Sequence, residues 1–141
     1  MDLGNGFRID QPPVVVLWGI SESDLQSLLG PALRRVTEKY WVARVRVLGS
    51  LSCNLGFIFR DTCGGLSELE FFRDSYQDQA ASFEEFQRHF EAAFGVPTEQ
   101  HPAAEGFPSY RWRVPGAEIV HFVFHRFGPE EHMRIRRQGA A

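Results

Sequence analysis

Two stretches of the chain share one pattern: an apolar alternating run, a turn that contains glycine, and a second alternating run. The first stretch is NLGFIFRDTCGGLSELEFF at 54–72, and the second is IVHFVFHRFGPEEHMRIRR at 119–137. Successive residues of a β-strand point to opposite faces of a sheet, so this alternation predicts strands that bury one face. Runs joined by short glycine-bearing turns are typical of antiparallel neighbours. The chain is therefore expected to build an antiparallel sheet on a hydrophobic core.

Helix signals precede both stretches. Ser21 and Asp24 match a capping box, and Ser82 and Glu85 repeat it. Each predicted helix then ends at a glycine with a proline close behind it, the usual sign of a helix C-terminus. The apolar side of the second helix is dominated by phenylalanine. We therefore expect one helix before each set of strands, packed on the sheet.

The same order of elements is expected twice. The predicted strands cover 14–18, a short buried strand, and 40–48, 55–59, 69–71, 110–114, 120–124 and 133–135, with a proline-containing loop at 98–108 and a turn at 127–129. We predict a single α+β domain, residues 1–141, of two helix-plus-three-strand antiparallel repeats with both helices on one face of the sheet. The pseudo-repeats span about 14–74 and 82–137. The alternative is that the two meanders are alike only because both alternate.

Alternation also predicts which side chains form the core. The expected inner residues are Trp41, Ala43, Val45, Val47, Leu55, Phe57, Phe59, Leu69, Phe71, Tyr110, Trp112, Val114, Val120, Phe122, Phe124, Met133 and Ile135. On this assignment Phe122→Ala should destabilise the protein by roughly 3–5 kcal/mol, because it would empty a core site.

Composition excludes several classes of protein. The formal net charge of -3 and the pI near 5.9 argue against a general nucleic-acid coat. The first residues lack the pattern of a signal peptide, and the longest apolar run, 14–18, is too short to span a bilayer. Cys53 and Cys63 lie near opposite ends of one predicted strand, about 25–30 Å apart and too far to bridge. We expect reduced thiols and a cytoplasmic protein without membrane partners.

No residue set indicates a reaction. A nucleophile elbow and a phosphate-binding loop are both missing, so we expect no enzyme, no cofactor and no metal. The alternative is a small metal-dependent enzyme that uses His121, His125 and His132 with Glu131. His121 and His125 would lie roughly 13 Å apart along one strand, which leaves at most two histidines able to converge.

The sheet face without helices is the predicted binding surface. Its candidate partner-binding residues are Arg44, Arg46, Ile58, Phe72, Arg111, Arg113, His121, Val123, His125, His132, Arg134 and Arg136. Arginine and aromatic residues are enriched in protein interfaces, so a protein partner is expected, bound by this face or by the loops. The alternatives are an ordinary solvated face, a homodimer through this face, and a nucleic-acid-binding module that uses the arginines of the second half, which the net charge disfavours.

The segment from Gly19-Ile20-Ser21 to Leu28-Leu29-Gly30-Pro31, with a second capped helix ending in Gly-x-Pro, resembles a known arrangement. It is similar to the helix-plus-sheet repeats of the β-lactamase inhibitor protein family, of the small β-barrel assembly lipoprotein fold and of several bacterial toxin-immunity families. The resemblance covers about residues 18–137 and rests on caps, turns and strand ends. It implies a cytoplasmic bacterial immunity protein that neutralises a cognate toxin by direct binding. No binding residue carries over from it.

Overall fold

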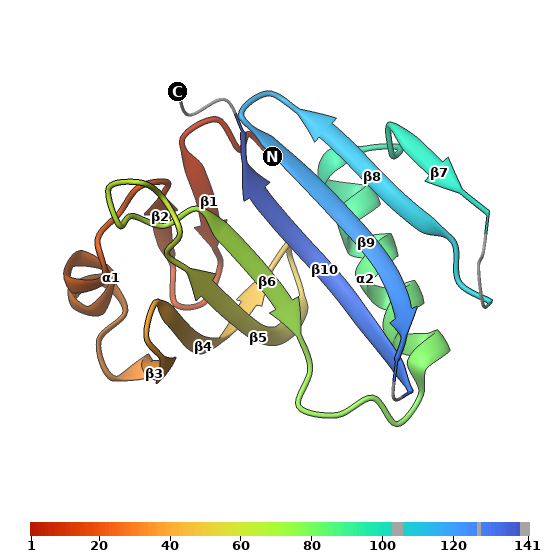
Figure 1. Cartoon of the computed structure of the whole chain (residues 1–141), viewed down its shortest axis with the longest axis horizontal. Helices are drawn as coiled ribbons and strands as arrows, with labels where there is room; N and C mark the ends of the chain where they lie inside the picture. Colours follow the sequence, from red (N-terminus) through yellow and green to blue (C-terminus); the bar gives the residue numbers. More distant parts are fainter. Residues whose placement is uncertain (103–105, 127, 139–141) are drawn as a thin grey trace.

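The structure is a computed structural model that describes residues 1–102, 106–126 and 128–138. It contains one eight-stranded antiparallel sheet, a separate two-stranded hairpin, two α-helices and a short 3-10 helix, η1 (Figure 1). The elements are β1 (Gly6–Ile9), β2 (Val14–Leu17), α1 (Glu22–Leu29), η1 (Gly30–Ala32), β3 (Leu33–Thr37), β4 (Tyr40–Val47), β5 (Leu51–Ile58), β6 (Glu68–Phe72), α2 (Gln79–Phe94), β7 (Glu99–His101), β8 (Ser109–Val114), β9 (Ala117–His125) and β10 (Pro129–Arg137).

Each half of the chain has a helix followed by a four-stranded meander, where three strands were expected. The strand order is β3-β4-β5-β6-β10-β9-β8-β7, so the last strands of the two halves meet in the middle (Figure 1). The unpredicted strands β3 and β7 form the outer edges. Their sequences, LRRVT and EQH, are short and polar and show no alternation. The chain is an α+β fold, and its origin by duplication stays a prediction.

Both edges of the sheet are poorly suited to pairing with another strand. β3 carries two arginines, and its register shifts at a bulge between Arg35 and Thr37. β7 has three residues, lies between Pro97 and Pro102, and occupies part of the expected loop. Residues 103–105 of that loop and Phe127 of the turn before β10 lie outside the described residues. Bulges, charges and flanking prolines protect a sheet edge, so the faces remain as binding surfaces.

The caps agree with the sequence for one helix and differ for the other. Ser21 Oγ accepts a hydrogen bond from the Asp24 N–H at 3.0 Å, as the capping box predicts. α2 is capped instead by Asp78, whose carboxylate accepts from the Ala81 N–H at 3.0 Å. The prediction of Ser82 as the N-cap is wrong, because Asp78 starts the helix one turn earlier. Neither α-helix is long and apolar enough to cross a bilayer over the described residues.

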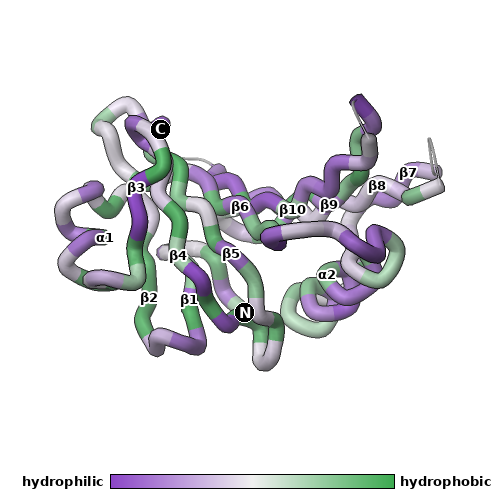
Figure 2. Tube along the Cα trace, turned by 90° about the horizontal axis from the view of Figure 1, so that it is seen from below, coloured by the Kyte–Doolittle hydropathy of each residue, from purple (hydrophilic) through white to green (hydrophobic). Residues whose placement is uncertain are grey.

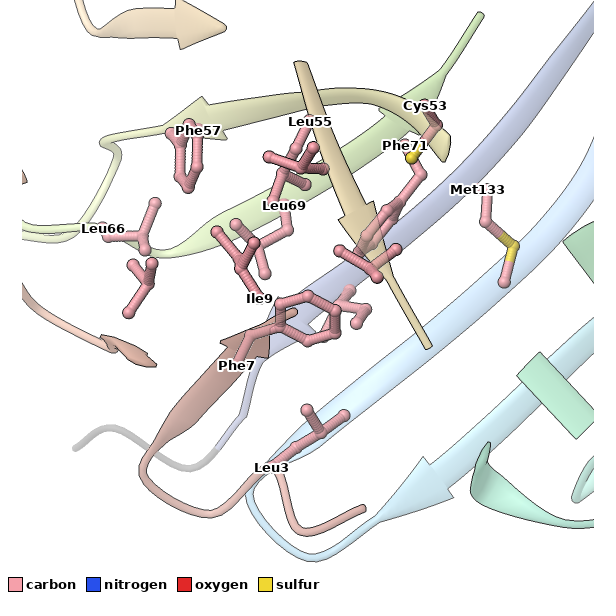
Figure 3. Packing of buried hydrophobic residues seen from close by; sticks show 14 of the residues in the cluster. Leu3, Phe7, Ile9, Cys53, Leu55, Phe57, Leu66, Leu69, Phe71 and Met133 are labelled. Carbon is pink, nitrogen blue, oxygen red and sulfur yellow. The ribbon is translucent and has the colours of Figure 1, made fainter. Parts of the chain in front are cut away.

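One face of the sheet carries the core. α2 and the β1–β2 hairpin lie on the same side of the sheet (Figure 2). Phe71 of β6 makes edge contacts with Phe7 of the hairpin at 5.4 Å and with Phe90 of α2 at 5.2 Å between ring centroids. Figure 3 shows Phe7 and Ile9 pointing toward Leu69 and Phe71 of the sheet. The core is thus shared by both halves and by the hairpin.

The close approach of the two hairpin strands requires glycine at position 6. A Cβ on Gly6 would lie 2.2 Å from the carbonyl oxygen of Val16, the residue next to its partner on β2. Any side chain here would push the strands apart. A four-residue run such as 6–9 is too short to show periodicity, so β1 was not expected. The strand expected at 14–18 is β2, but Val15 and Leu17 are exposed instead of buried.

The predicted inner face of β9 is wrong. Ala117, Ile119 and His121 point to the core and are buried, whereas Val120, Phe122 and Phe124 point to the other side. The pairing of Ile119 with Trp112 of β8 sets this phase. Phe122→Ala is therefore no longer expected to empty a core site.

Both cysteines are free thiols. Cys53 is buried on the core side of β5, and burial raises the pKa of its thiol to about 12, against the weaker opposing effect of Arg73 and Arg44. Cys63 is exposed in the loop between β5 and β6. A thiol with so high a pKa is a poor nucleophile at neutral pH, so Cys53 is a packing residue.

Candidate functional site

We call the side of the eight-stranded sheet turned away from α2 and the β1–β2 hairpin the open face (Figure 2). Strand alternation and pairing assign residues to it: Arg136 of β10, for example, pairs with Glu118 of β9 and Glu68 of β6. Nine of the predicted partner-binding residues lie on this face: Arg44, Arg46, Ile58, Phe72, Arg111, Arg113, His132, Arg134 and Arg136.

Three predicted residues, His121, Val123 and His125, lie on the opposite side, because the phase of β9 is the reverse of the expected one. His121 is fully buried under α2, where the Phe83 ring stacks on it at 4.0 Å. His132 stacks on Phe122 on the open face at 4.9 Å. The histidines of the metal-site alternative therefore cannot converge on one ion. The described residues contain no group of three or more histidines, cysteines or carboxylates suited to a metal.

An apolar stripe, which was expected in the core, runs along β9 on the open face. We define it as Val120, Phe122 and Phe124. Burial falls along the stripe, from Val120 at 6% exposed to Phe124 at 50%. Glu118 was the signal that could have revealed it: a carboxylate on a core face is costly, and residues 118, 120, 122 and 124 share one face.

A charged network crosses the centre of the open face. Glu68 accepts hydrogen bonds from Arg134 Nη1 and Arg136 Nε, both at 2.9 Å. Glu70 lies 3.6 Å from Arg134 Nη2 and accepts from the Tyr40 hydroxyl at 3.3 Å. Burial, with the neighbouring Glu70 charge, raises the pKa of Tyr40 to about 12. Tyr40 is therefore a neutral hydrogen-bond donor at physiological pH.

A second network lies toward the β7 edge. Arg111 contacts Glu99 at 3.3 Å through Nε and Glu118 at 2.7 Å through Nη1, and Arg113 Nη1 contacts Glu99 at 3.1 Å. Partly exposed pairs of this kind stabilise a protein by about 0–1 kcal/mol each. Their larger effect is to hold the guanidinium groups in place and to neutralise them. The second half of the open face is consequently far less basic than its arginines suggest.

The first half of the open face keeps more free positive charge. Arg44 forms an ion pair with Asp74, which also accepts from Asn54 Nδ2 at 2.8 Å; the Asn54 hydrogen bond and then Arg44 hold the pKa of Asp74 below its usual range. Arg34 and Arg46 are exposed, and neither has an ion pair within the described ranges. The charge available to a partner is therefore concentrated over β3 and β4.

A buried polar cluster lies on the opposite side, between α2 and β9–β10. Glu131 is at its centre: Oε2 is 2.6 Å from His121 Nε2, and Oε1 accepts from Ser82 Oγ and Gln79 Nε2, both at 2.8 Å. Burial lowers the pKa of His121 and outweighs the opposing hydrogen bond and charge of Glu131. Gln87 Oε1 lies 2.8 Å from His121 Nδ1.

The geometry of this cluster does not match nucleophilic catalysis. The Ser82 hydroxyl donates to Glu131, while a serine nucleophile needs a base such as the imidazole as its partner. His121 and the Glu131 side chain are almost wholly sealed from solvent, at 0% and 1% exposed. We assign the cluster to the packing of α2 on the sheet, where each polar group needs a partner.

Comparison with known proteins does not name a function. No protein-family model and no curated protein sequence matches the chain. One similar solved structure is the crystal structure of YjgB, a DUF4309 family protein from Bacillus subtilis subsp. subtilis str. 168. It is 13% identical, with a TM-score of 0.47, and the match covers 84% of this chain and 78% of that one.

Proposed function

We propose that this protein is a protein-binding module whose interface is the open face. The observation that carries the proposal is the apolar stripe: Phe122 and Phe124 lie on a helix-free sheet face instead of in the core. Exposed aromatic residues bordered by polar ones are characteristic of protein interfaces. Solvent contact alone would favour polar residues at these positions.

The charge of the open face favours a folded protein partner that is acidic where it covers the first half of the face. Arg34 of β3 and Arg46 of β4 offer free positive charge on the same face, separated from the stripe by the strands β5, β6 and β10, while the chain as a whole carries a net charge of -3. Complementary charge around an apolar centre increases association rate and specificity. In its specific form the proposal is a cytoplasmic bacterial inhibitor that neutralises a toxin by binding it.

The alternatives fit the face less well. Nucleic-acid binding would need phosphate contacts from the arginines of the second half, but Arg111, Arg113, Arg134 and Arg136 are already paired with glutamates. An enzyme would need a reactive group on the face, and the two arginine–glutamate networks supply no nucleophile. The face instead carries ion pairs and exposed aromatic rings, which are features of protein interfaces.

We expect Phe124→Ser to weaken binding of the partner by about 30-fold or more, which is the effect of losing roughly 2 kcal/mol at an interface hot spot. The measurement is calorimetric titration of the purified product of the neighbouring gene into wild type and variant. Folding should be unchanged, because Phe124 is 50% exposed.

Val15→Ser is the matched control. Val15 is also about half exposed, at 52%, but it belongs to the hairpin on the other side of the sheet. Equal losses in both variants, or full binding by Phe124→Ser, would refute the assignment of the open face. Binding of an arbitrary RNA with a steep salt dependence would favour the nucleic-acid alternative, and dimerisation lost in Phe124→Ser would show that a second copy covers the face.

A further inference from the structure

A pocket of about 420 Å³ opens beside the apolar stripe, over the strands β7 to β10. Its lining includes His101, Ser109, Arg111, Val120, Phe122 and Arg136. Val120 is buried, and Phe122 is held on another side by the stacked His132 ring. The pocket therefore combines an apolar part with two arginines from different strands.

The arginines do not make this an anion site. Arg111 is paired with Glu99 and Glu118, and Arg136 Nε donates to Glu68 at 2.9 Å. Each positive charge already has a carboxylate partner, so an incoming anion would compete with a glutamate. These ion pairs fix the orientation of both guanidinium groups. The flat surface of each group is still available for contact with a ligand.

A flat guanidinium held in place is well suited to stacking on an aromatic ring. The protein uses this contact elsewhere: the Arg73 guanidinium lies 4.6 Å from the centre of the Phe86 ring, and that of Arg126 lies 5.7 Å from the Phe124 ring. The Phe122 ring adds a surface for ring–ring contact. The volume is within the range of small-ligand pockets, ample for one aromatic side chain.

We infer that this pocket receives an aromatic side chain, tyrosine, tryptophan or phenylalanine, presented by the protein partner. The inference rests on the proposed function and deepens it, because it names the chemical group that anchors the partner. Arg111 and Arg136 stack on the ring, Val120 and Phe122 contact its apolar surface, and the glutamates hold the arginines in position. An aromatic anchor in a preformed pocket is a common interface hot spot.

The test uses N-acetyl-L-tryptophanamide as the probe, titrated into the isotope-labelled full chain and followed by NMR. We expect saturable shifts, with a dissociation constant on the order of millimolar, at the amides of Arg111, Val120 and Phe122 and at the Arg136 side chain. Phe122→Leu and Arg136→Gln should each weaken the probe at least threefold. Arg46→Gln, an exposed arginine of the first half, should leave its affinity unchanged.

The comparison probes decide between ligand classes. Equal or stronger shifts with sodium acetate or inorganic phosphate would overturn the inference in favour of an anion site, and equal shifts with N-acetyl-L-leucinamide would overturn the requirement for a ring. The absence of saturable shifts would also overturn it. Since no partner is present, failure here leaves the open-face interface standing. Full partner binding by Phe124→Ser would instead refute the proposed function without changing the probe result.

Discussion

The imidazole of His121 lies between the Phe83 ring at 4.0 Å and the Glu131 carboxylate at 2.6 Å, out of contact with water. Because burial lowers its pKa, the neutral ring is favoured. A neutral ring has one donor and one acceptor: Nε2–H donates to Glu131, which leaves Nδ1 as an acceptor that faces the amide oxygen of Gln87 at 2.8 Å. Turning that amide by 180° presents its nitrogen to Nδ1, which gives the otherwise unpartnered Gln87 Nε2 a partner.

This residue makes stability depend on pH. We expect the free energy of unfolding to fall as the pH drops below about 6.5, because the unfolded chain then binds a proton on His121 that the folded chain does not. His132 acts in the same direction, since burial and Arg134 lower its pKa.

Urea unfolding at a series of pH values from about 5 to 7.5 measures this dependence. The free energy of unfolding should change less steeply with pH in His121→Gln than in the wild type. His101→Gln, on the exposed β7, should retain the wild-type slope, and an equally steep slope in His121→Gln would contradict the assignment.

At the scale of single elements, α2 and β9 carry phenylalanines of opposite roles. Phe86 and Phe90 of α2 are fully buried against the sheet. Phe122 and Phe124 of β9 face the open side, with one partly and one half exposed. Both elements are rich in phenylalanine, so composition alone does not separate core rings from interface rings. Whether a ring belongs to the core or to the interface depends on what covers it: the rings of α2 are covered by the sheet, and those of β9 lie on the uncovered face.

A comparison of alanine variants tests this division. Phe90→Ala should lower the free energy of unfolding by roughly 3–5 kcal/mol, because a fully buried ring leaves a cavity. Phe124→Ala should change it by less than about 1 kcal/mol, since half of that ring is already in water. Urea denaturation followed by far-UV circular dichroism measures both. Similar losses in the two variants would mean that the phase of β9 is misassigned.

At the scale of the whole molecule, the two halves share one hydrophobic core. β6 and β10 pair along the middle of the sheet, with Phe71 opposite Met133 and Leu69 opposite Ile135. All four side chains are buried in a single core cluster that also includes the hairpin and both helices. Neither half could keep its apolar face covered if the other unfolded.

We therefore expect one cooperative unfolding transition. Single-tryptophan variants can report on each half separately: one keeps Trp41 in β4, the other keeps Trp112 in β8. In each variant the fluorescence midpoint should coincide with that of circular dichroism in urea, as two-state unfolding requires. Midpoints that separate in either variant would show that the halves unfold independently.

Local patterns were sufficient for part of the fold and of the site. In β4 the arginines 44 and 46 alternate cleanly with apolar residues, and in β6 the glutamates 68 and 70 do the same. The side of the sheet on which these charged residues lie could therefore be predicted from the alternation of adjacent residues. The buried face of β9 could not be predicted from alternation alone, because the strand has apolar residues at both odd and even positions. These residues are Ile119, Val120, Phe122, Val123 and Phe124.

By itself, the sequence determined the α+β class, the first helix cap and the faces of the strands with clean alternation, because these depend on residues close together in the chain. Tertiary structure alone decided the rest. Arg134 reaches Glu68 across 66 residues, and the packing of β9 against β8 and α2 turns Phe122 outward and His121 inward. Contacts between distant residues leave no local signature, so the ion pairs of the open face and its pocket could be found only in the folded protein, whereas Glu118 was the one local hint of the aromatic stripe.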